Sequence, residues 1–409
     1  MDVIYLDNNA TTRPLPGVTE AVAEAHEELW ANPSSVHRFG QAVRQRMELA
    51  RASTAKLIGA RPRELVLASG GTEANNLAIW GTLGEDFSAA TFITTKTEHA
   101  AVRELAENVE KRGGRVVWLP ILEGGRVDLG ALAELLDEAS RESQIVLLSV
   151  MWANNETGVV QPIEEIAGAM TEAREAARQA GRAVKFVFHT DATQAVGKLP
   201  VDVKFSGGAC VDLLTFAAHK FHGPKGVGAL WLRRGVRVRP QQLGGPQETE
   251  RRGGTENVPG VIGMGVAAEA AAEFVNNNEE IAWLRGLRDR LEERVKAGLP
   301  EGVDLSVNSG GEERLWNTTN LGFRGLEAEA ILLGLSERGV CASAGAACSS
   351  GSLEPSPVLR AMGVEEAVAH GSIRLSLSRF TTEAEIDRAA EVVAEVVGRL
   401  SRVMPMGGV

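Results

Sequence analysis

The stretch VKFVFHTDATQAVGK, residues 184–198, begins as a largely apolar run and ends in a carboxylate and a polar turn. Such a run is typical of a strand buried on both faces of a sheet. Helix-like stretches, including residues 17–30, 41–59 and 72–83, alternate with runs of this kind. The pattern predicts an α/β fold, with a mostly parallel seven-stranded sheet covered by helices on both faces. The six other expected strands are ELVLAS (64–69), ATFITT (90–95), RVVWLP (115–120), IVLLSV (145–150), DLLTFAA (212–218) and VGALWL (227–232).

The C-terminal part of the chain shows a different pattern. A long helical region reaches about Leu299, and a final helix over residues 381–403 has Thr381 or Thr382 as its expected N-cap. We therefore expect a large domain of residues 14–260 and a smaller α+β domain of residues 1–13 and 261–409. Between the two helical regions lie VDLSVN (303–308), TTNLGF (318–323), a helical segment (325–339) and SIRLSLS (372–378).

Composition and charge exclude several classes of protein. The net charge of −11 provides no basic field for a nucleic-acid backbone. No segment approaches 18 uninterrupted apolar residues, and the N-terminus lacks a basic-then-apolar signal, so we expect a cytoplasmic protein without a membrane span. The three cysteines (Cys210, Cys341 and Cys348) are too few for a disulfide framework and show no zinc-type pairing, so no metal site is expected.

Reactive residues follow three of the expected strands. Gly71 and Thr72 lie where a strand turns into a helix, which favours an anion site, although a simple glycine turn has the same sequence. Asp191 follows an apolar strand and has to be paired there, either with a protonated ring nitrogen or as an N-cap of a following helix. Lys220, next to His219, ends another strand. Desolvation would make its amine a nucleophile able to form a Schiff base, while a solvated or paired lysine is the ordinary alternative.

Taken together, these three features predict a pyridoxal 5'-phosphate site: an anion cradle, a carboxylate for the pyridine nitrogen and a lysine for the aldehyde. In the second domain, Arg374 is suited to bind a substrate carboxylate with two parallel hydrogen bonds. Cys348 lies in a long run of small residues that ends at Pro355 and Pro357, which indicates a mobile loop with an exposed thiol. We expect Cys341 and Cys210, which adjoin apolar segments, to be buried and inert.

The ordered motifs of the whole chain resemble those of the cysteine desulfurases of the nitrogen-fixation and iron–sulfur-cluster group, within the class V aminotransferases. The resemblance implies a type I aminotransferase fold, a homodimer with active sites at the subunit interface, and conversion of L-cysteine to L-alanine with the sulfur held as a persulfide. The motifs are YLDNNATT, NPSSVHRFG, SGGTEANNLAI, TKTEHAAV, NNETGVVQPI, DATQAVGKLPVDV, AAHKFHGPKGVGAL, GGTENVPGVIGMG, CSSGSLEPSPVLRAMG and SIRLSLSRFTTEAEID.

The resemblance also implies a role for individual residues. Lys220 would carry the cofactor, Asp191 would pair with its ring nitrogen, and Arg374 would bind the substrate carboxylate. Cys348 would accept the sulfur, and His99 would stack on the ring and help to move protons, although it could also be only a helix cap. The remaining residues are Gln194 and Asn155 near the phenolic oxygen, Gly71, Thr72 and His219 at the phosphate, Thr255 at the phosphate from the partner subunit, and Asn32 and Asn155 near the substrate.

One departure from the family pattern affects the phosphate site, since Ala217 stands where relatives have a serine. A selenocysteine lyase or an aminotransferase of the same fold remains an alternative, as does a non-catalytic scaffold. The sulfur acceptor, an iron–sulfur scaffold or another protein, is not indicated by any motif in the sequence.

Overall fold

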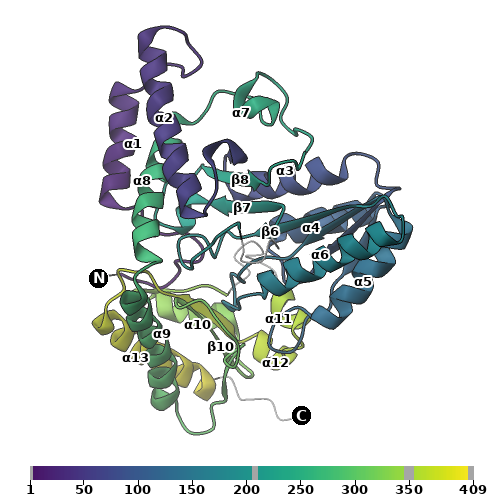
Figure 1. Cartoon of the computed structure of the whole chain (residues 1–409). Helices are drawn as coiled ribbons and strands as arrows, with labels where there is room; N and C mark the ends of the chain where they lie inside the picture. The colour runs from purple at the N-terminus through teal and green to yellow at the C-terminus, as the bar shows by residue number, and fades with distance from the viewer. Residues whose placement is uncertain (1–2, 205–210, 345–353, 404–409) are drawn as a thin grey trace.

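A seven-stranded sheet forms the centre of the large domain (Figure 1). The structure is a computed structural model that describes residues 3–204, 211–344 and 354–403. The strand at one edge, β2, and its neighbour β8 pair antiparallel, as do β8 and β7, whereas the other four pairings are parallel. The predicted mostly parallel seven-stranded sheet is therefore confirmed. In spatial order the strands are β2 (Leu65–Ala68), β8 (Gly228–Leu232), β7 (Leu213–Ala217), β6 (Lys185–Asp191), β5 (Ile145–Ser149), β3 (Ala90–Thr94) and β4 (Arg115–Trp118).

Each central strand buries side chains on both faces, which explains its continuous apolar sequence. Leu147 of β5 belongs to one hydrophobic cluster, while its neighbours Val146 and Leu148 belong to another. Helices α3 (Gly71–Leu83) and α4 (Ala100–Lys111) pack in the first of these clusters. The helices of the second cluster are α1 (Pro16–Glu28), α2 (Arg38–Leu57), α5 (Leu129–Glu142), α6 (Ile163–Gln179) and α8 (Val258–Phe274).

A three-stranded antiparallel sheet packs with two long helices and a shorter one in the smaller part of the molecule, below the large sheet in Figure 1. At the start of its last helix, the Thr382 hydroxyl accepts from the N–H of Glu385, so Thr382 is the N-cap that the sequence left open between two threonines. The elements are β9 (Leu305–Val307), β10 (Thr318–Phe323), β12 (Ser372–Ser376), α9 (Asn278–Gly298), α10 (Ala328–Ser336), α13 (Glu383–Val403) and the short α11 (Pro357–Ala361) and α12 (Glu366–Ala369).

The expected long helical region is divided into α8 and α9, whose axes meet at 88°. The buried side chains of α8 belong to the core of the large domain, and a separate core begins at Phe274. The sequence predicts a domain boundary at residue 260. From the separation of the two cores we propose a boundary near residue 275 in its place. Among the described residues no single helix is long and apolar enough to cross a membrane, and only the bent pair of α8 and α9 passes that test together.

The N-terminal segment crosses from the small domain to the large one. Its strand β1 (Ile4–Tyr5) pairs parallel with β11 (Val340–Cys341), and the N–H of Asn8 then donates to Ser376 O. A few residues later the N–H of Thr12 donates to His219 O, at the end of β7. Residues 7–12 therefore lie between the two domains, next to the carboxyl ends of the central strands.

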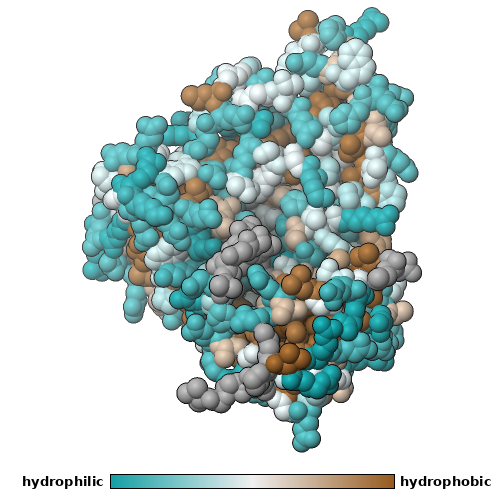
Figure 2. All heavy atoms as spheres, turned by 180° about the vertical axis from the view of Figure 1, so that it is seen from behind, coloured by the Kyte–Doolittle hydropathy of each residue, from teal (hydrophilic) through white to brown (hydrophobic). Residues whose placement is uncertain are grey.

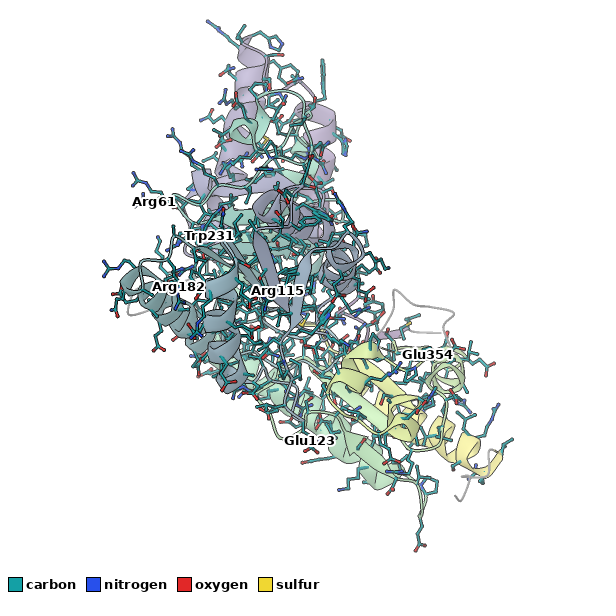
Figure 3. All side chains as sticks on the ribbon, turned by 90° about the vertical axis from the view of Figure 1, so that its right-hand side faces the viewer. Arg61, Arg115, Glu123, Arg182, Trp231 and Glu354 are labelled. Carbon is teal, nitrogen blue, oxygen red and sulfur yellow. The ribbon has the colours of Figure 1, made fainter. Side chains whose placement is uncertain are left out.

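Charged side chains cover the outside of both domains, among them Arg61 and Glu354 (Figure 3). Hydrophilic residues dominate the face shown in Figure 2, where hydrophobic residues appear in separate groups. Cys341 is only partly buried in β11, so the expectation of a fully buried thiol is wrong: a two-stranded pairing at the domain edge covers less of a side chain than the central sheet does. Cys210 lies outside the described residues.

A buried ion pair fixes the segment after β8 to the large domain. Glu248 accepts from Arg51 Nη1 at 2.8 Å and Nη2 at 2.6 Å, and from the N–H of Leu67 at 2.9 Å. Glu248, Thr249 and Glu250 all have positive φ, which is uncommon outside glycine. The bonds of Glu248 hold this unusual backbone against α2 and β2.

We expect Glu248→Gln to lower the free energy of unfolding by about 3 kcal/mol, because the charge of Arg51 stays buried without its carboxylate. Denaturant unfolding measures the loss. The matched control is Glu24→Gln, which removes the exposed ion pair of Glu24 with Arg46 and should change stability by less than about 1 kcal/mol. Equal small effects of the two substitutions would contradict the prediction.

Candidate active site

A cavity of about 370 Å³ lies at the carboxyl ends of β6 and β7, beside the start of α3. Ligands of parallel sheets bind at this edge. Nine residues singled out in the sequence line it: Gly71, Thr72, His99, Asn155, Asp191, Gln194, His219, Lys220 and Arg374. Asn32 and Thr255 do not line this cavity, and Cys348 lies outside the described residues.

Lys220 ends the short 3₁₀ turn (Ala218–Lys220) that follows β7. Its Nζ donates to Asn9 O at 2.6 Å and to Ala10 O at 2.8 Å, both in the N-terminal segment. The amine is thus partly buried and held by main-chain carbonyls, so it is a paired lysine that also faces the cavity. This placement suits a nucleophile, since the two main-chain carbonyls orient the amine at the cavity wall.

Asp191 is the last residue of β6 and is only 5 % exposed. Asn75 Nδ2 of α3 donates to Asp191 Oδ2 at 2.7 Å, and the N–H of Thr193 donates to Asp191 Oδ1 at 3.0 Å. The structure forms a turn after Asp191, not a helix, so the alternative that this residue caps a following helix is wrong. The carboxylate instead closes a tight local turn and stays at the cavity wall.

Helix α3 begins at Gly71, which confirms the predicted strand–turn–helix arrangement. A Cβ at Gly71 would lie 3.1 Å from Thr193 Oγ1, so the helix start closely approaches the turn that follows Asp191. A Cβ at Gly228 of β8 would lie 2.6 Å from Phe216 O and 2.9 Å from Gly70 Cα. Glycine at these positions lets the turn sit against the sheet, which directs the first N–H groups of α3 toward the cavity edge.

Two histidines border the cavity, and burial lowers the pKa of both. His99 is the N-cap of α4, where its Nδ1 accepts from the N–H of Ala101 at 3.1 Å; the helix-cap role is confirmed. For His99 the charge of Asp191 opposes the effect of burial. For His219, burial and the neighbouring Lys220 lower the pKa to about 4. Because Nδ1 of His99 is an acceptor, its neutral ring carries the proton on Nε2.

Arg374 reaches the cavity from β12 of the small domain and is 2 % exposed. Its Nη1 donates to Asn155 O at 2.9 Å, and its Nη2 donates to Asp7 Oδ1 at 2.6 Å. Gln194 lies on the other side, where its Nε2 donates to Asn9 O at 2.9 Å. Residues from both domains and from the N-terminal segment therefore meet in one site.

Sequence reasoning missed several residues of the cavity wall. Burial raises the pKa of Glu98 well above its usual value, while its Oε1 accepts from the N–H of Met151 at 2.6 Å. Burial also raises the pKa of Glu156, whose Oε2 accepts from Ser356 Oγ. Glu98 and Glu156 lie within the motifs, next to His99 and Asn155. Nothing in the sequence around an acidic residue at these positions indicates that it is buried. The other missed residues that line the cavity include Asn9, Asn75 and Thr193.

The wall of the cavity suits a polar, anionic ring compound. Buried polar atoms are almost always hydrogen-bonded, yet Asn155 Oδ1, Thr193 Oγ1 and Arg374 Nε lack a partner among the described residues. With the N–H groups at the start of α3, these atoms supply partners for an anion and for ring substituents. The Asp191 carboxylate and the Lys220 amine add groups for a ring nitrogen and an aldehyde, so the residues present fit pyridoxal 5'-phosphate.

Comparison with known proteins places this arrangement in a family. The family model described as "Aminotransferase class-V" matches residues 4–389. A "Cysteine desulfurase" of Nostoc sp. is 47% identical over 99% of this chain and 95% of its own length. The "Cysteine desulfurase NifS" of Azotobacter vinelandii is 45% identical over 98% of this chain and 94% of its own length.

Solved structures of similar fold support the same family assignment. A "NIFS-LIKE PROTEIN" superposes with a TM-score of 0.85 at 33% identity, covering 98% of this chain and 100% of its own. The structure titled "SspA in complex with cysteine" has a TM-score of 0.73 at 31% identity, covering 92% of this chain and 99% of its own. With its fold, its strand-end lysine and aspartate and these full-length relatives, the chain belongs to the cysteine desulfurases of the class V aminotransferase family.

Proposed function

We propose that this protein is a pyridoxal 5'-phosphate-dependent cysteine desulfurase (EC 2.8.1.7), which converts L-cysteine to L-alanine and holds the sulfur as a persulfide on Cys348. One observation carries the proposal: a single cavity contains a strand-end lysine, a strand-end carboxylate, a helix N-terminus and an arginine from the other domain. Relatives named cysteine desulfurase along almost the full length support the choice of substrate.

The residues of the cavity divide the binding of the cofactor among them. The N–H groups at Gly71 and Thr72 would hold the phosphate, together with His219, and Asp191 would keep the ring nitrogen protonated. Gln194 and Asn155 would bind the phenolic oxygen, His99 would stack on the ring, and Lys220 would be the residue that carries the cofactor. When bound, the cofactor supplies an electron sink for the negative charge that develops at the substrate α carbon.

The chain's own groups then bind the substrate and move protons. Arg374 binds the carboxylate of cysteine, for which its contact with Asp7 has to rearrange. The amine of Lys220 would take the α proton of the substrate and later deliver a proton to the carbon that becomes the methyl group of alanine. The neutral His99 has an Nε2–H that can donate within the same site.

Cys348 is proposed as the sulfur acceptor, and the described residues on either side of its segment contact or line the cavity wall. Ser343 pairs with Arg374 through two main-chain hydrogen bonds, and Pro357 lines the cavity wall. At about 3.3 Å per extended residue, the five residues from Ser343 to Cys348 span up to about 16 Å. We propose that the thiolate attacks the substrate sulfur within this reach; its attack breaks the carbon–sulfur bond, and the electron pair stays with the carbon that becomes the methyl group of alanine.

The experiment that tests this function combines product analysis with labelling. We expect the protein to form alanine and sulfide from L-cysteine with reductant, and borohydride to leave a pyridoxyl adduct on Lys220. Cys348→Ala should keep the cofactor's visible absorbance but lose sulfur transfer, since the nucleophile alone is removed. A keto acid instead of alanine would point to an aminotransferase, greater activity on selenocysteine to a lyase, and a colourless protein without an adduct to a scaffold.

We further propose that two copies of the chain complete each site. Thr255 lines a separate cavity of about 100 Å³, and Asn32 is exposed, so neither reaches the site of its own chain. Large exposed apolar side chains lie near both segments: Trp30, Val36 and Leu243 are 72, 93 and 81 % exposed. Large apolar side chains that are exposed to this degree near both segments support a protein interface there.

We expect a homodimer in solution, with Leu243→Glu weakening the dimer because a charge would be buried against apolar surface. Light scattering after gel filtration measures the mass. A monomer for the unaltered chain at micromolar concentration would overturn this part of the proposal. The acceptor of the sulfur, an iron–sulfur scaffold or another protein, and the cytoplasmic location stay predictions.

Ala217 provides a test of the phosphate side of the site. It is the last residue of β7, and its Cβ would be 3.9 Å from a Cβ at Gly71. A serine here would present a hydroxyl at the start of α3. We expect Ala217→Ser to slow cofactor dissociation about fivefold, on the scale of one net hydrogen bond of about 1 kcal/mol. Release of the cofactor to a trapping agent measures the rate, with Ala218→Ser as the matched control; an unchanged rate would refute the prediction.

A further inference from the structure

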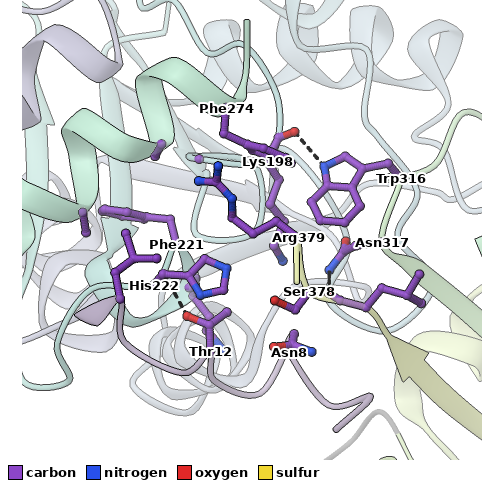
Figure 4. Close-up of a pocket in the computed structure, with 16 residues that line it drawn as sticks. Asn8, Thr12, Lys198, Phe221, His222, Phe274, Trp316, Asn317, Ser378 and Arg379 are labelled. Carbon is purple, nitrogen blue, oxygen red and sulfur yellow. Dashed lines mark hydrogen bonds between the residues drawn. The ribbon is translucent and has the colours of Figure 1, made fainter. Parts of the chain in front are cut away.

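Lys198 is a buried basic residue that does not line the active-site cavity but contacts Gln194, which does. It is 4 % exposed and lies in the turn region that follows β6, seven residues after Asp191. Its Nζ donates to Asn9 Oδ1 at 2.8 Å and to Gln194 Oε1. Figure 4 shows Lys198 among the residues of a second, much smaller cavity, of about 20 Å³, where Trp316 Nε1 donates to Lys198 O at 3.0 Å.

The orientation of the Asn9 amide is settled by its other partners. Asn9 Nδ2 donates to Thr318 Oγ1 at 2.9 Å and to Asn155 O at 3.1 Å. Its Oδ1 therefore faces away from them, where it accepts from Lys198 and from Asn317 Nδ2 at 3.1 Å. The orientation of Asn9 is thus fixed, since reversing its amide would place Oδ1 against the carbonyl of Asn155 and Nδ2 against the Lys198 amine.

The orientation of the Gln194 amide follows from its contacts with Asn9 and Lys198. Gln194 Nε2 donates to the main-chain carbonyl of Asn9, which can only accept, and Gln194 Oε1 accepts from Lys198 Nζ. Reversing the amide would place two acceptors, Gln194 Oε1 and Asn9 O, against each other, and two donors at Lys198. Nε2 has two hydrogens, so one remains for the cavity that Gln194 lines.

We propose that Lys198 is a positioning residue that locks the Gln194 amide, so that Gln194 offers an N–H donor and not a carbonyl to the cavity. The inference rests on the proposed function, in which that donor meets the phenolic oxygen of the cofactor. Burial lowers the pKa of Lys198 well below its usual value, and Lys220 and Arg374 lower it further. The lock works in either protonation state, because an uncharged amine still has two N–H donors for the two acceptors.

A donor to the phenolic oxygen stabilises its negative form, and so lowers the pH at which the bound cofactor changes its visible absorbance. An amide that itself accepts a hydrogen bond is also a stronger donor. Lys198→Met keeps an unbranched side chain as far as the ε position and removes the N–H donors. We expect the absorbance midpoint of the loaded protein to rise by about half to one pH unit, the scale of one net hydrogen bond.

A double-mutant cycle shows whether Lys198 acts through Gln194. Gln194→Ala should raise the midpoint by a similar amount, and Lys198→Met should add nothing in the Gln194→Ala background. Additive shifts, or no shift in Lys198→Met, would overturn the inference. Trp316→Phe is the matched control: it removes the bond to Lys198 O in the same small cavity but leaves Nζ untouched, and should not move the midpoint. Lys198→Arg keeps N–H donors and should restore most of the unaltered midpoint, also if Lys198→Met fails to fold.

Crystal structures of the cofactor-free proteins separate this inference from the proposed function. In the unaltered protein Gln194 Nε2 should bond Asn9 O, and in Lys198→Met the amide should leave that position. A Gln194 amide that stays in place without Lys198 would overturn the lock, whether or not the protein binds the cofactor. Failure of the proposed function would appear instead as an unaltered protein that takes up no pyridoxal 5'-phosphate at all.

Discussion

The site depends on the parallel pairing of β6 with β7, in which Asp191 lies opposite Thr215. Parallel neighbours end at the same edge of a sheet, so the carboxylate after one strand and the lysine after the next share a single cavity. Both strands are buried on both faces, and a shift in their register would move each side chain into a packing site shaped for another residue. The hydrophobic core therefore holds Asp191 and Lys220 at one edge more firmly than any contact between these two residues would.

The N-terminal segment turns that edge into an enclosed site. Its main-chain carbonyls at Asn9 and Ala10 hold Lys220. The Asn9 side chain has four hydrogen-bond partners, which come from both domains: Asn155, Lys198, Asn317 and Thr318. Arg374 closes the site from β12 and contacts Asp7 of the same segment. Cofactor-binding and substrate-binding groups thus meet where two separately packed cores adjoin. A site at such a boundary is compatible with the proposed function, in which the substrate side has to admit the thiol of Cys348.

Several buried polar groups in the cavity have roles beyond packing. Asp191 is held by Asn75 and by its own turn, and Gln194 is held by Asn9 and Lys198. These supporting contacts decide which atom of each side chain faces the cavity. An active site built this way loses little side-chain entropy when its ligand arrives, because the orientation of each group is set in advance.

The sequence by itself determined the sheet, the helix start at Gly71 and the strand-end positions of Asp191 and Lys220, because apolar periodicity and glycine turns are local signals. It also carried the family motifs, including Arg374. Only the tertiary structure decided that Asn9, Glu98 and Lys198 belong to the site, that Asp191 closes a turn and caps no helix, and that α8 packs with the large domain. Those facts depend on which surfaces meet across long separations in the chain. The identity of a polar residue does not show whether water or a neighbouring domain will satisfy its hydrogen bonds.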